Sequence, residues 1–324
     1  MRATLRIGIT LGDVNGIGPE IALRAVNRRG WPQHVQFVLV GAPAVVRAQA
    51  RALGLRIPGR RISILDPAPA LTPDWKPGQI RVDASRAAEA WIRAAVAACL
   101  DGRLHAMVTA PICKEGFQKA GFRVPGHTEL LANLTRTRRY AMMLFGGSLR
   151  VVLVTRHLPL ADVARKLRTA DILEAIRLTG KALPWLGCRR ARIGVCGLNP
   201  HAGDGGAIGR EEIEVIAPAI RAAKRAGFNV TGPVPADVIF HQAVHGEFDA
   251  VVAMYHDQGL GPLKMLAFET GVNVTLGLPI VRTSPDHGTA FNIAGRGRAN
   301  SSSMIEAVRQ AIALAGRKNP WRGR

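Results

Sequence analysis

Three histidines follow short apolar segments that have the composition of buried strands. His157 comes after LRVVLVT, His201 after ARIGVCG and His256 after DAVVAMY. Neutral imidazoles bind borderline divalent cations, and three protein ligands with one open position are typical of a catalytic metal site. A single histidine is more often an ordinary hydrogen-bonding residue. On these grounds, the three histidines could form a metal site, or each could have a structural role.

Another pair of histidines, His241 and His245, is spaced four residues apart. This spacing would place both rings on one face of a helix. The zinc-protease motif requires a glutamate directly after the first histidine, and the chain has Gln242 at that position. We therefore favour a surface or structural role for this pair.

Polar groups in the C-terminal third would suit a small anion. Lys264 and Arg282 could bind a phosphate or carboxylate, with Asn273 as donor and acceptor, although a lone lysine is usually a surface residue. Asp286, in RTSPDHGTA, could exchange protons or cap a turn. The glycines of GDVNGIGPE match neither a Rossmann fingerprint nor a P-loop, and HAGDGGAIG fits an anion-binding nest and a flexible turn equally well.

Short apolar segments alternate with longer segments of helical period. The expected strands are 5–10, 35–41, 105–110, 149–155, 191–197 and 249–255, and the expected helices are 85–100, 169–183, 210–227 and 301–316. This alternation predicts an α/β protein with a largely parallel sheet. Ser85, Thr169 and Ser301 are expected to be helix N-caps, and the proline- and glycine-rich residues 56–80 to form irregular surface structure.

Polar clusters follow most of the expected strands, among them GDVNGIGPE, PICKEGFQKAGFRVPGHTE, RHLPL, LNPHAGDGG and HDQG. Ligands of open parallel sheets bind at the carboxyl ends of the strands, where such loops converge. We therefore expect one cleft to collect these loops.

Charge and composition restrict the classes of partner. The 324 residues contain 44 Lys plus Arg and 23 Asp plus Glu, a formal charge of +21, but the basic residues are scattered and only 5% of residues are aromatic. A solvated basic surface is favoured over a nucleic-acid groove. The four cysteines lack disulfide or metal spacing, the first apolar run is too short to predict a signal peptide, and no later run reaches about 18 apolar residues. We expect a cytoplasmic protein with free thiols and no membrane partner.

Several segments resemble the 4-hydroxythreonine-4-phosphate dehydrogenase family of vitamin B6 biosynthesis. They are GDVNGIGPEIAL, TAPICKEGFQKAGFRVPGHTELLA, HLPL, GLNPHAGDGGAIGREE, MYHDQGLGPLK and GVNVTLGLPIVRTSPDHGTAFNIAG, in family order along the chain. The resemblance implies a two-domain α/β/α fold like that of isocitrate and isopropylmalate dehydrogenases, with the active site in the interdomain cleft. The expected domains are 1–125 with 275–324, and 126–274, which would carry the interface of a homodimer.

The resemblance also implies roles for individual residues. His157, His201 and His256 would bind one divalent metal ion (zinc, magnesium or cobalt), one of them from the partner subunit. His127, Thr128, Lys264, Asn273 and Arg282 would bind substrate, and NAD or NADP would accept the hydride. Asp237, Asp257 and Asp286 are candidates for proton transfer. Cys113 departs from the polar residues expected at its position. The adjacent Lys114 could lower the pKa of its thiol, but we favour a cysteine without a chemical role.

The implied activity is oxidation of 4-phosphohydroxy-L-threonine, followed by decarboxylation to 3-amino-2-oxopropyl phosphate. A dehydrogenase of D-threonate or D-erythronate 4-phosphate is the main alternative. The GHTE segment and the Lys, Asn and Arg set favour a phosphorylated substrate over a dihydrodiol dicarboxylate. The histidine set speaks against an inactive polyanion-binding protein, and no specific nucleic-acid partner is expected.

Overall fold

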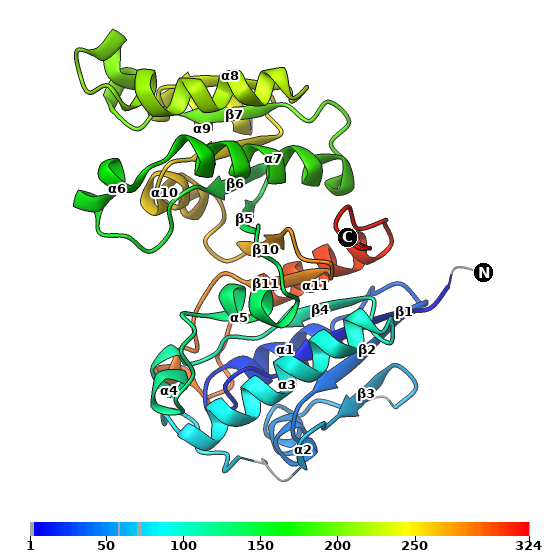
Figure 1. Cartoon of the computed structure of the whole chain (residues 1–324). Coiled ribbons are helices and arrows are strands. Elements are labelled where there is room, and N and C mark those ends of the chain that lie inside the picture. The colour runs from blue at the N-terminus through cyan, green and yellow to red at the C-terminus, as the bar shows by residue number, and fades with distance from the viewer. Residues whose placement is uncertain (1–2, 58, 70–72, 324) are drawn as a thin grey trace. The chain divides into compact units, whose positions relative to one another are not determined.

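The computed structural model describes residues 3–57, 59–69 and 73–323. The chain forms two compact units (Figure 1). The first unit consists of Met1–Arg138 and Leu278–Arg324, and the second consists of Arg139–Gly277. Each unit has its own sheet region and its own helices, which confirms the expected α/β class.

The first unit contains five parallel strands in the order β3-β2-β1-β4-β11. They are β1 Leu5–Thr10, β2 Val35–Val40, β3 Ile62–Leu65, β4 Ala106–Thr109 and β11 Arg282–Pro285. Strand β3 lies within the segment expected to be irregular, so that expectation was wrong for these residues. Residues 58 and 70–72 of that segment lie outside the described residues.

Helices cover both faces of these strands (Figure 1). The helices of the first unit are α1 Gly18–Asn27, α2 Pro43–Ala52, α3 Val82–Leu100, α4 Lys114–Lys119, α5 His127–Leu134, α11 Ser302–Ala315 and the short η4 Phe291–Ile293. Helix α1 packs against α2 and α11, whereas α3 packs against α4 and α5. Both α1 and α11 begin at the carboxyl edge of the strands and run back toward the amino edge.

The second unit contains six strands in the order β10-β5-β6-β9-β7-β8. They are β5 Ala141–Gly146, β6 Leu149–Leu153, β7 Ile193–Cys196, β8 Val230–Val234, β9 Ala250–Ala253 and β10 Val272–Leu276. Strands β6, β9, β7 and β8 are parallel, but β5 is antiparallel to both of its neighbours. Two residues join β5 to β6, and Gly147 has a positive φ of 57°. So short a connection permits only an antiparallel hairpin.

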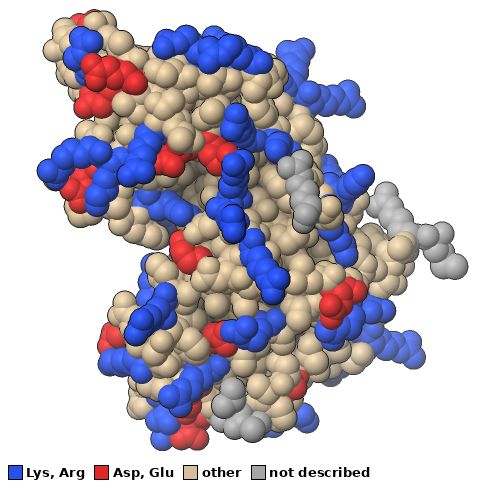
Figure 2. All heavy atoms as spheres, in the orientation of Figure 1, with Lys and Arg blue, Asp and Glu red and all other residues tan. Residues whose placement is uncertain are grey.

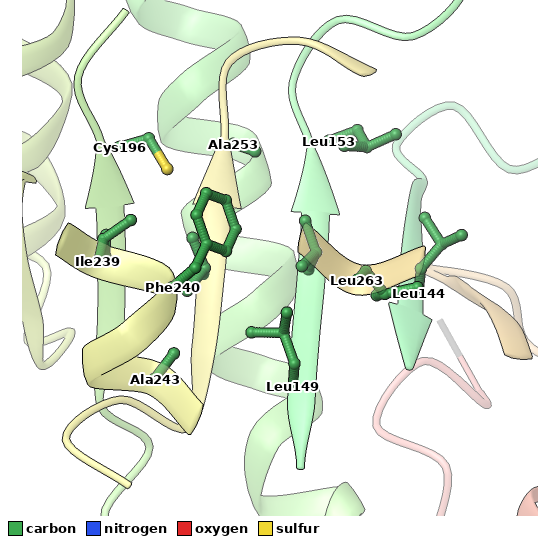
Figure 3. Close-up of a cluster of buried hydrophobic side chains, with 11 residues drawn as sticks. Leu144, Leu149, Leu153, Cys196, Ile239, Phe240, Ala243, Ala253 and Leu263 are labelled. Atoms are coloured by element: carbon green, nitrogen blue, oxygen red, sulfur yellow. The ribbon is translucent and has the colours of Figure 1, made fainter. Parts of the chain in front are cut away.

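The helices of the second unit also cover both faces. They are α6 Leu160–Lys166, α7 Thr169–Leu186, η2 Pro200–Gly206, η3 Glu212–Ile216, α8 Ala217–Arg225, α9 Ala236–Val244 and α10 His256–Ala267. Figure 3 shows α9 and α10 in front of strands β7, β9 and β6, where Phe240, Leu149 and Leu263 belong to one buried apolar cluster. This cluster fixes the two helices whose first turns carry Asp237 and Asp257.

Two of the expected N-caps were wrong. Helix α3 begins at Val82, so Ser85 lies inside it and is buried. Helix α7 begins at Thr169, whose hydroxyl donates to the carbonyl of Val215 at 3.0 Å. Ser301 is the N-cap of α11, but its side chain makes no capping hydrogen bond. Because tertiary contacts already hold these ends, a side-chain cap is not required.

The surface agrees with a solvated distribution of charge. On the face shown in Figure 2, Lys and Arg side chains are spread over both units and alternate with uncharged surface and acidic residues. All four cysteines are free thiols, as expected. Among the described residues, no helix has the length and apolar character needed to cross a membrane.

Candidate active site

Three neighbouring parallel strands of the second unit place the three histidines. His157 follows β6, His256 begins the helix after β9, and His201 follows β7. Strand β9 pairs with both β6 and β7, so the three strands end at the same edge of the sheet. The three histidine loops therefore lie at one edge of this sheet, and the wider expectation of one cleft that also collects the loops of the first unit stays a prediction.

The structure brings two of these histidines together. The ring centroids of His157 and His256 are 5.7 Å apart, and Nδ1 of His256 lies 2.7 Å from Oδ1 of Asp257. A carboxylate on one ring nitrogen orients a histidine and leaves its other nitrogen for a metal, so this pair fits a divalent cation. In the described part of the chain, no group of three His, Cys, Asp or Glu side chains is close enough to hold a metal ion. Within one chain, His157 and His256 thus lie close together, and His201 does not join them in a group of three.

The His201 loop has an unusual backbone. His201, Ala202 and Asp204 have φ values of 51°, 53° and 43°, with Gly203 and Gly205 also positive. Residues other than glycine adopt this left-handed region at an energetic cost, so other contacts must hold the loop. The conformation agrees with the backbone nest that the glycines suggested.

Glu212 supplies those contacts, and sequence reasoning did not find it. Its carboxylate is 4% exposed and accepts hydrogen bonds from the backbone N–H groups of Leu198 and Asn199, at 2.7 and 2.8 Å. It also accepts one from the Asn199 side chain at 2.9 Å. Three donors on one buried carboxylate fix the loop that carries His201. The acidic pair Glu211 and Glu212, directly after the glycine-rich loop, was the feature of the sequence that could have indicated this role.

If His201 binds a divalent cation as the sequence predicts, replacing Glu212 with alanine should weaken that binding by about 10- to 100-fold, the usual effect of removing a group that orients a metal ligand. Glu212→Gln keeps one oxygen acceptor and should lose less. Calorimetric titration with Co²⁺ measures this affinity. Glu214→Ala is the matched control, because exposed Glu214 pairs with Arg210. Equal affinities for the Glu212→Ala and Glu214→Ala proteins would contradict a positioning role for Glu212.

Gln258 joins the loops after β9 and β7. Its Oε1 accepts from the backbone N–H of Met254, and its Nε2 donates to the carbonyl of Gly197, both at 2.7 Å. The Thr155 hydroxyl donates to the carbonyl of Met254 at 2.7 Å and so ties the loop after β6 to the same point. These buried bonds hold the three histidine loops at one edge.

The segment HDQGLGPLK is explained by how α10 packs. A side chain at Gly259 would come within 2.6 Å of Val151 and 3.0 Å of Leu153, so glycine allows the helix to lie directly on β6. Lys264 is half-buried, with its ammonium 5.5 Å from the ring centroid of Phe268. Asn273, on β10, is 8% exposed, and its buried Oδ1 has no hydrogen-bond partner among the described residues. These polar groups fit ligand binding.

A second set of predicted residues lies in the first unit. Arg282, at the start of β11, is 2% exposed, and its Nε and Nη2 donate to the Thr109 hydroxyl at 3.2 and 2.7 Å. Burial lowers the pKa of Arg282 to about 9, while the Glu129 carboxylate acts in the opposite direction. The guanidinium therefore remains charged at neutral pH, and a buried planar cation of this kind suits a phosphate.

His127 is the first residue of α5, and its burial and the charges of Arg282 and Lys114 affect its pKa. Burial, then Arg282 and Lys114, lower the pKa of its imidazole well below the ordinary value, so the ring is neutral. Its buried Nε2 has no hydrogen-bond partner among the described residues, and the adjacent Thr128 is also buried. Lys114 is thus a further cationic group of this site, which the sequence interpretation considered only as a neighbour of Cys113.

Cys113 has a structural role. It is the N-cap of α4, where its sulfur accepts a hydrogen bond from the backbone N–H of Gly116 at 3.3 Å. Burial raises the pKa of its thiol. The suggestion that Lys114 lowers this pKa was wrong, because burial disfavours the thiolate.

The three aspartates considered for proton transfer lie on three different segments. Asp257 and Asp237 are exposed residues in the first turns of α10 and α9, in the second unit. Asp286 is half-buried in the first unit, where its backbone N–H donates to the Ser303 hydroxyl at 3.1 Å. His241 and His245 lie on the exposed side of α9, with ring centroids 4.0 Å apart.

Asp13 is a buried acid that the sequence did not indicate. It follows β1 and is 0% exposed, and one oxygen accepts from the Asn15 backbone N–H at 2.9 Å while the other has no partner among the described residues. Burial raises the pKa of its carboxyl from 3.8 to about 6. One pKa unit corresponds to about 1.4 kcal/mol, so ionised Asp13 destabilises the folded chain by roughly 3 kcal/mol.

Replacing Asp13 with asparagine should therefore raise the free energy of unfolding by about 1–3 kcal/mol at pH 8. In the unchanged protein, the raised pKa means that protonated Asp13 costs nothing below pH 3.8. The folded state loses stability as pH rises above 3.8, and the full loss is reached above the folded-state pKa of about 6. The gain should be roughly half as large at pH 5. Urea unfolding at both pH values measures it, with the exposed Asp101→Asn as control. A gain that is independent of pH would contradict this assignment.

Solved structures define the class of fold. A β-decarboxylating dehydrogenase from Thermococcus kodakarensis matches with a TM-score of 0.50 at 15% identity, covering 98% of this chain and 85% of that one. This likeness confirms the expected fold and no more. A 4-hydroxythreonine-4-phosphate dehydrogenase from Klebsiella pneumoniae matches with a TM-score of 0.84 at 39% identity, covering 96% and 100%.

Sequence comparison identifies the family. The model of the family described as "Pyridoxal phosphate biosynthetic protein PdxA" matches residues 28–311. The chain is 48% identical to a 4-hydroxythreonine-4-phosphate dehydrogenase from Desulfosudis oleivorans, over 94% of this chain and 95% of the relative. It is 44% identical to a D-threonate 4-phosphate dehydrogenase from Cupriavidus necator, over 96% and 98%. The chain belongs to this family of oxidoreductases.

Proposed function

We propose that the protein oxidises 4-phosphohydroxy-L-threonine with NAD or NADP and a divalent metal ion, and so serves pyridoxal phosphate biosynthesis in the cytoplasm. The observation that carries this proposal is the 48% identity, along nearly the whole chain, to a relative named for this substrate. The buried Arg282 and the neutral His127 support a phosphorylated substrate, because together they provide charge and a hydrogen-bonding ring nitrogen.

The residues have separate roles in this proposal. Arg282, His127 and Thr128 bind the phosphate end, and Lys264 and Asn273 bind the remaining polar groups of the substrate. His157, His201 and His256 hold the metal ion, which is zinc, magnesium or cobalt. When bound, the cation acts as a Lewis acid toward the substrate hydroxyl, and NAD or NADP accepts the hydride.

The chemistry begins at C3 of the substrate. The hydroxyl proton leaves to a base, for which Asp237, Asp257 and Asp286 are the candidates, while hydride leaves C3 for the nicotinamide. The product, 2-amino-3-oxo-4-phosphooxybutanoate, has a ketone β to its carboxylate. Loss of CO₂ leaves an electron pair that delocalises into that ketone, and protonation of the carbon gives 3-amino-2-oxopropyl phosphate. Lys264, a cationic group, suits stabilisation of the negative charge that develops on the ketone oxygen.

We propose that the protein is a homodimer. His157 and His256 lie close together, but the described residues contain no group of three possible metal ligands, so a second copy would complete the ligand set. The second unit also exposes large apolar side chains, including Leu160, Met265 and Phe268, which suit burial against another subunit.

Product analysis tests the proposed function. Metal-loaded protein with NAD or NADP and 4-phosphohydroxy-L-threonine should form reduced nicotinamide, CO₂ and 3-amino-2-oxopropyl phosphate in equal amounts. Omitting the metal by treatment with a chelator should abolish all three products. Reduced nicotinamide without CO₂ would contradict the proposed product, and no reduced nicotinamide with either cofactor would contradict the activity.

One observation favours a second candidate substrate. The D-threonate 4-phosphate dehydrogenase of Cupriavidus necator is nearly as similar to this chain as the relatives named for the amino acid. D-Threonate 4-phosphate has a hydroxyl where the amino acid has its amino group. The same phosphate site and histidines would serve both substrates, so contacts to that single group decide between them.

A further inference from the structure

A basic pocket lies in the first unit, away from the carboxyl ends of the strands. Its volume is about 270 Å³, and its lining residues are Arg28, Arg29, Gly30, Trp31, Pro32, Arg309 and Ile312. Residues 28–32 connect the end of α1 to the start of β2. The pocket is therefore at the amino edge of the strands, opposite to the edge where Arg282 meets Thr109.

Two of its three guanidinium groups have no acidic partner among the described residues. Arg28 lies over the ring of Trp31, with its central carbon 5.7 Å from the ring centroid, and exposed Arg29 has no ion pair. Arg309 forms an ion pair with Glu306 on the same helix. The pocket therefore keeps a net positive charge even when the Glu306 carboxylate is counted, and it favours an anion.

Trp31, Pro32 and Ile312 form the apolar part of the pocket lining. The buried indole of Trp31 donates to the carbonyl of Ala25 at 2.9 Å and packs edge-on against Phe37, with centroids 5.8 Å apart. Pro32 and Ile312 add apolar surface beside it. A ligand with a flat ring would bury apolar area here while its anionic group meets the arginines.

We propose that this pocket binds a small aromatic phosphate of the nucleoside monophosphate class. The volume is slightly below the range of about 300–1,000 Å³ that is usual for drug-sized ligands, so it suits one ring system and one phosphate. Arg28 and Arg29 donate to the phosphate, and the apolar surface of Trp31, Pro32 and Ile312 receives the ring. The site is separate from the residues assigned to the oxidation, and it does not depend on the proposed function.

Calorimetric titration of the full-length protein with adenosine 5′-monophosphate, adenosine and inorganic phosphate tests this site. Adenosine monophosphate should bind at least about tenfold more tightly than either fragment, because only the whole ligand uses both parts of the pocket. The Arg28→Ser/Arg29→Ser protein should bind it at least about tenfold more weakly than the unchanged protein. Equal affinity for phosphate and adenosine monophosphate would overturn the aromatic part of the proposal.

The matched control is Arg189→Ser/Arg190→Ser, which removes the same charge from an exposed pair in the second unit. This control should bind adenosine monophosphate as the unchanged protein does. Equal weakening in both double variants would reduce the effect to net charge and overturn the site. Absence of binding by the unchanged protein would overturn it directly. Thermal unfolding of both variants establishes that each is folded.

Discussion

Replacing His157 with alanine is expected to remove most of the bound metal and to lower kcat/KM by at least about a thousandfold. The expected size follows from the several kcal/mol that Lewis-acid stabilisation contributes to a barrier, at about 1.4 kcal/mol per tenfold in rate. His157 and His256 are the two of the three proposed metal ligands that lie close together in one chain, with ring centroids 5.7 Å apart. Losing one leaves an incomplete ligand set, which holds a cation far more weakly than the three histidines do.

The matched control is His245→Ala. His245 is an exposed histidine of the same unit, and its Nδ1 lies 2.8 Å from the carbonyl of His241. Metal content is measured by elemental analysis after gel filtration, and turnover by the formation of reduced nicotinamide. The His245→Ala protein should retain both. Full metal content and full turnover in the His157→Ala protein would contradict the metal assignment.

Replacing Arg282 is expected to have the second largest effect. The Arg282→Met protein should lose about 10²- to 10³-fold in kcat/KM for the phosphorylated substrate, since removing one partner of a buried charge pair commonly costs 2–5 kcal/mol. Arg282→Lys should recover only part of this loss, because lysine keeps the charge but not the planar pair of donors. Thr109→Val should act in the same direction, because the Thr109 hydroxyl accepts two hydrogen bonds from the guanidinium.

A substrate without phosphate separates binding of the phosphate from general damage. The unchanged protein should strongly prefer 4-phosphohydroxy-L-threonine over 4-hydroxy-L-threonine, and the Arg282→Met protein should lose most of that preference. The Thr109→Ser protein keeps the hydroxyl and should behave as the unchanged protein does. If Arg282→Met lowered the activity toward both substrates equally, Arg282 would not be the phosphate-binding residue.

The sequence located the loops that carry the candidate residues because strand composition is a local property. The apolar runs before His157, His201 and His256 lie on adjacent parallel strands, as the pattern predicted. Strand β5 was not among the expected strands, so its hairpin with β6 was missed. The two-residue connection at Gly147 was the local signal for it.

The supporting contacts could not be predicted, because they join residues that are distant along the chain. Gln258 contacts Gly197 across 61 positions, and Arg282 contacts Thr109 across 173. The raised pKa of Asp13 likewise arises from burial beneath other segments, and nothing in GDVNGIGPE reveals it. Residue type and spacing thus indicated candidate side chains, and only packing shows what holds them.

One measurement tests the proposed substrate most directly. Metal-loaded protein is supplied with NAD or NADP and with 4-phosphohydroxy-L-threonine or D-threonate 4-phosphate, and kcat/KM is determined from the absorbance of the reduced nicotinamide. We expect the higher kcat/KM for the amino acid. A higher value for D-threonate 4-phosphate would contradict the assignment to pyridoxal phosphate biosynthesis.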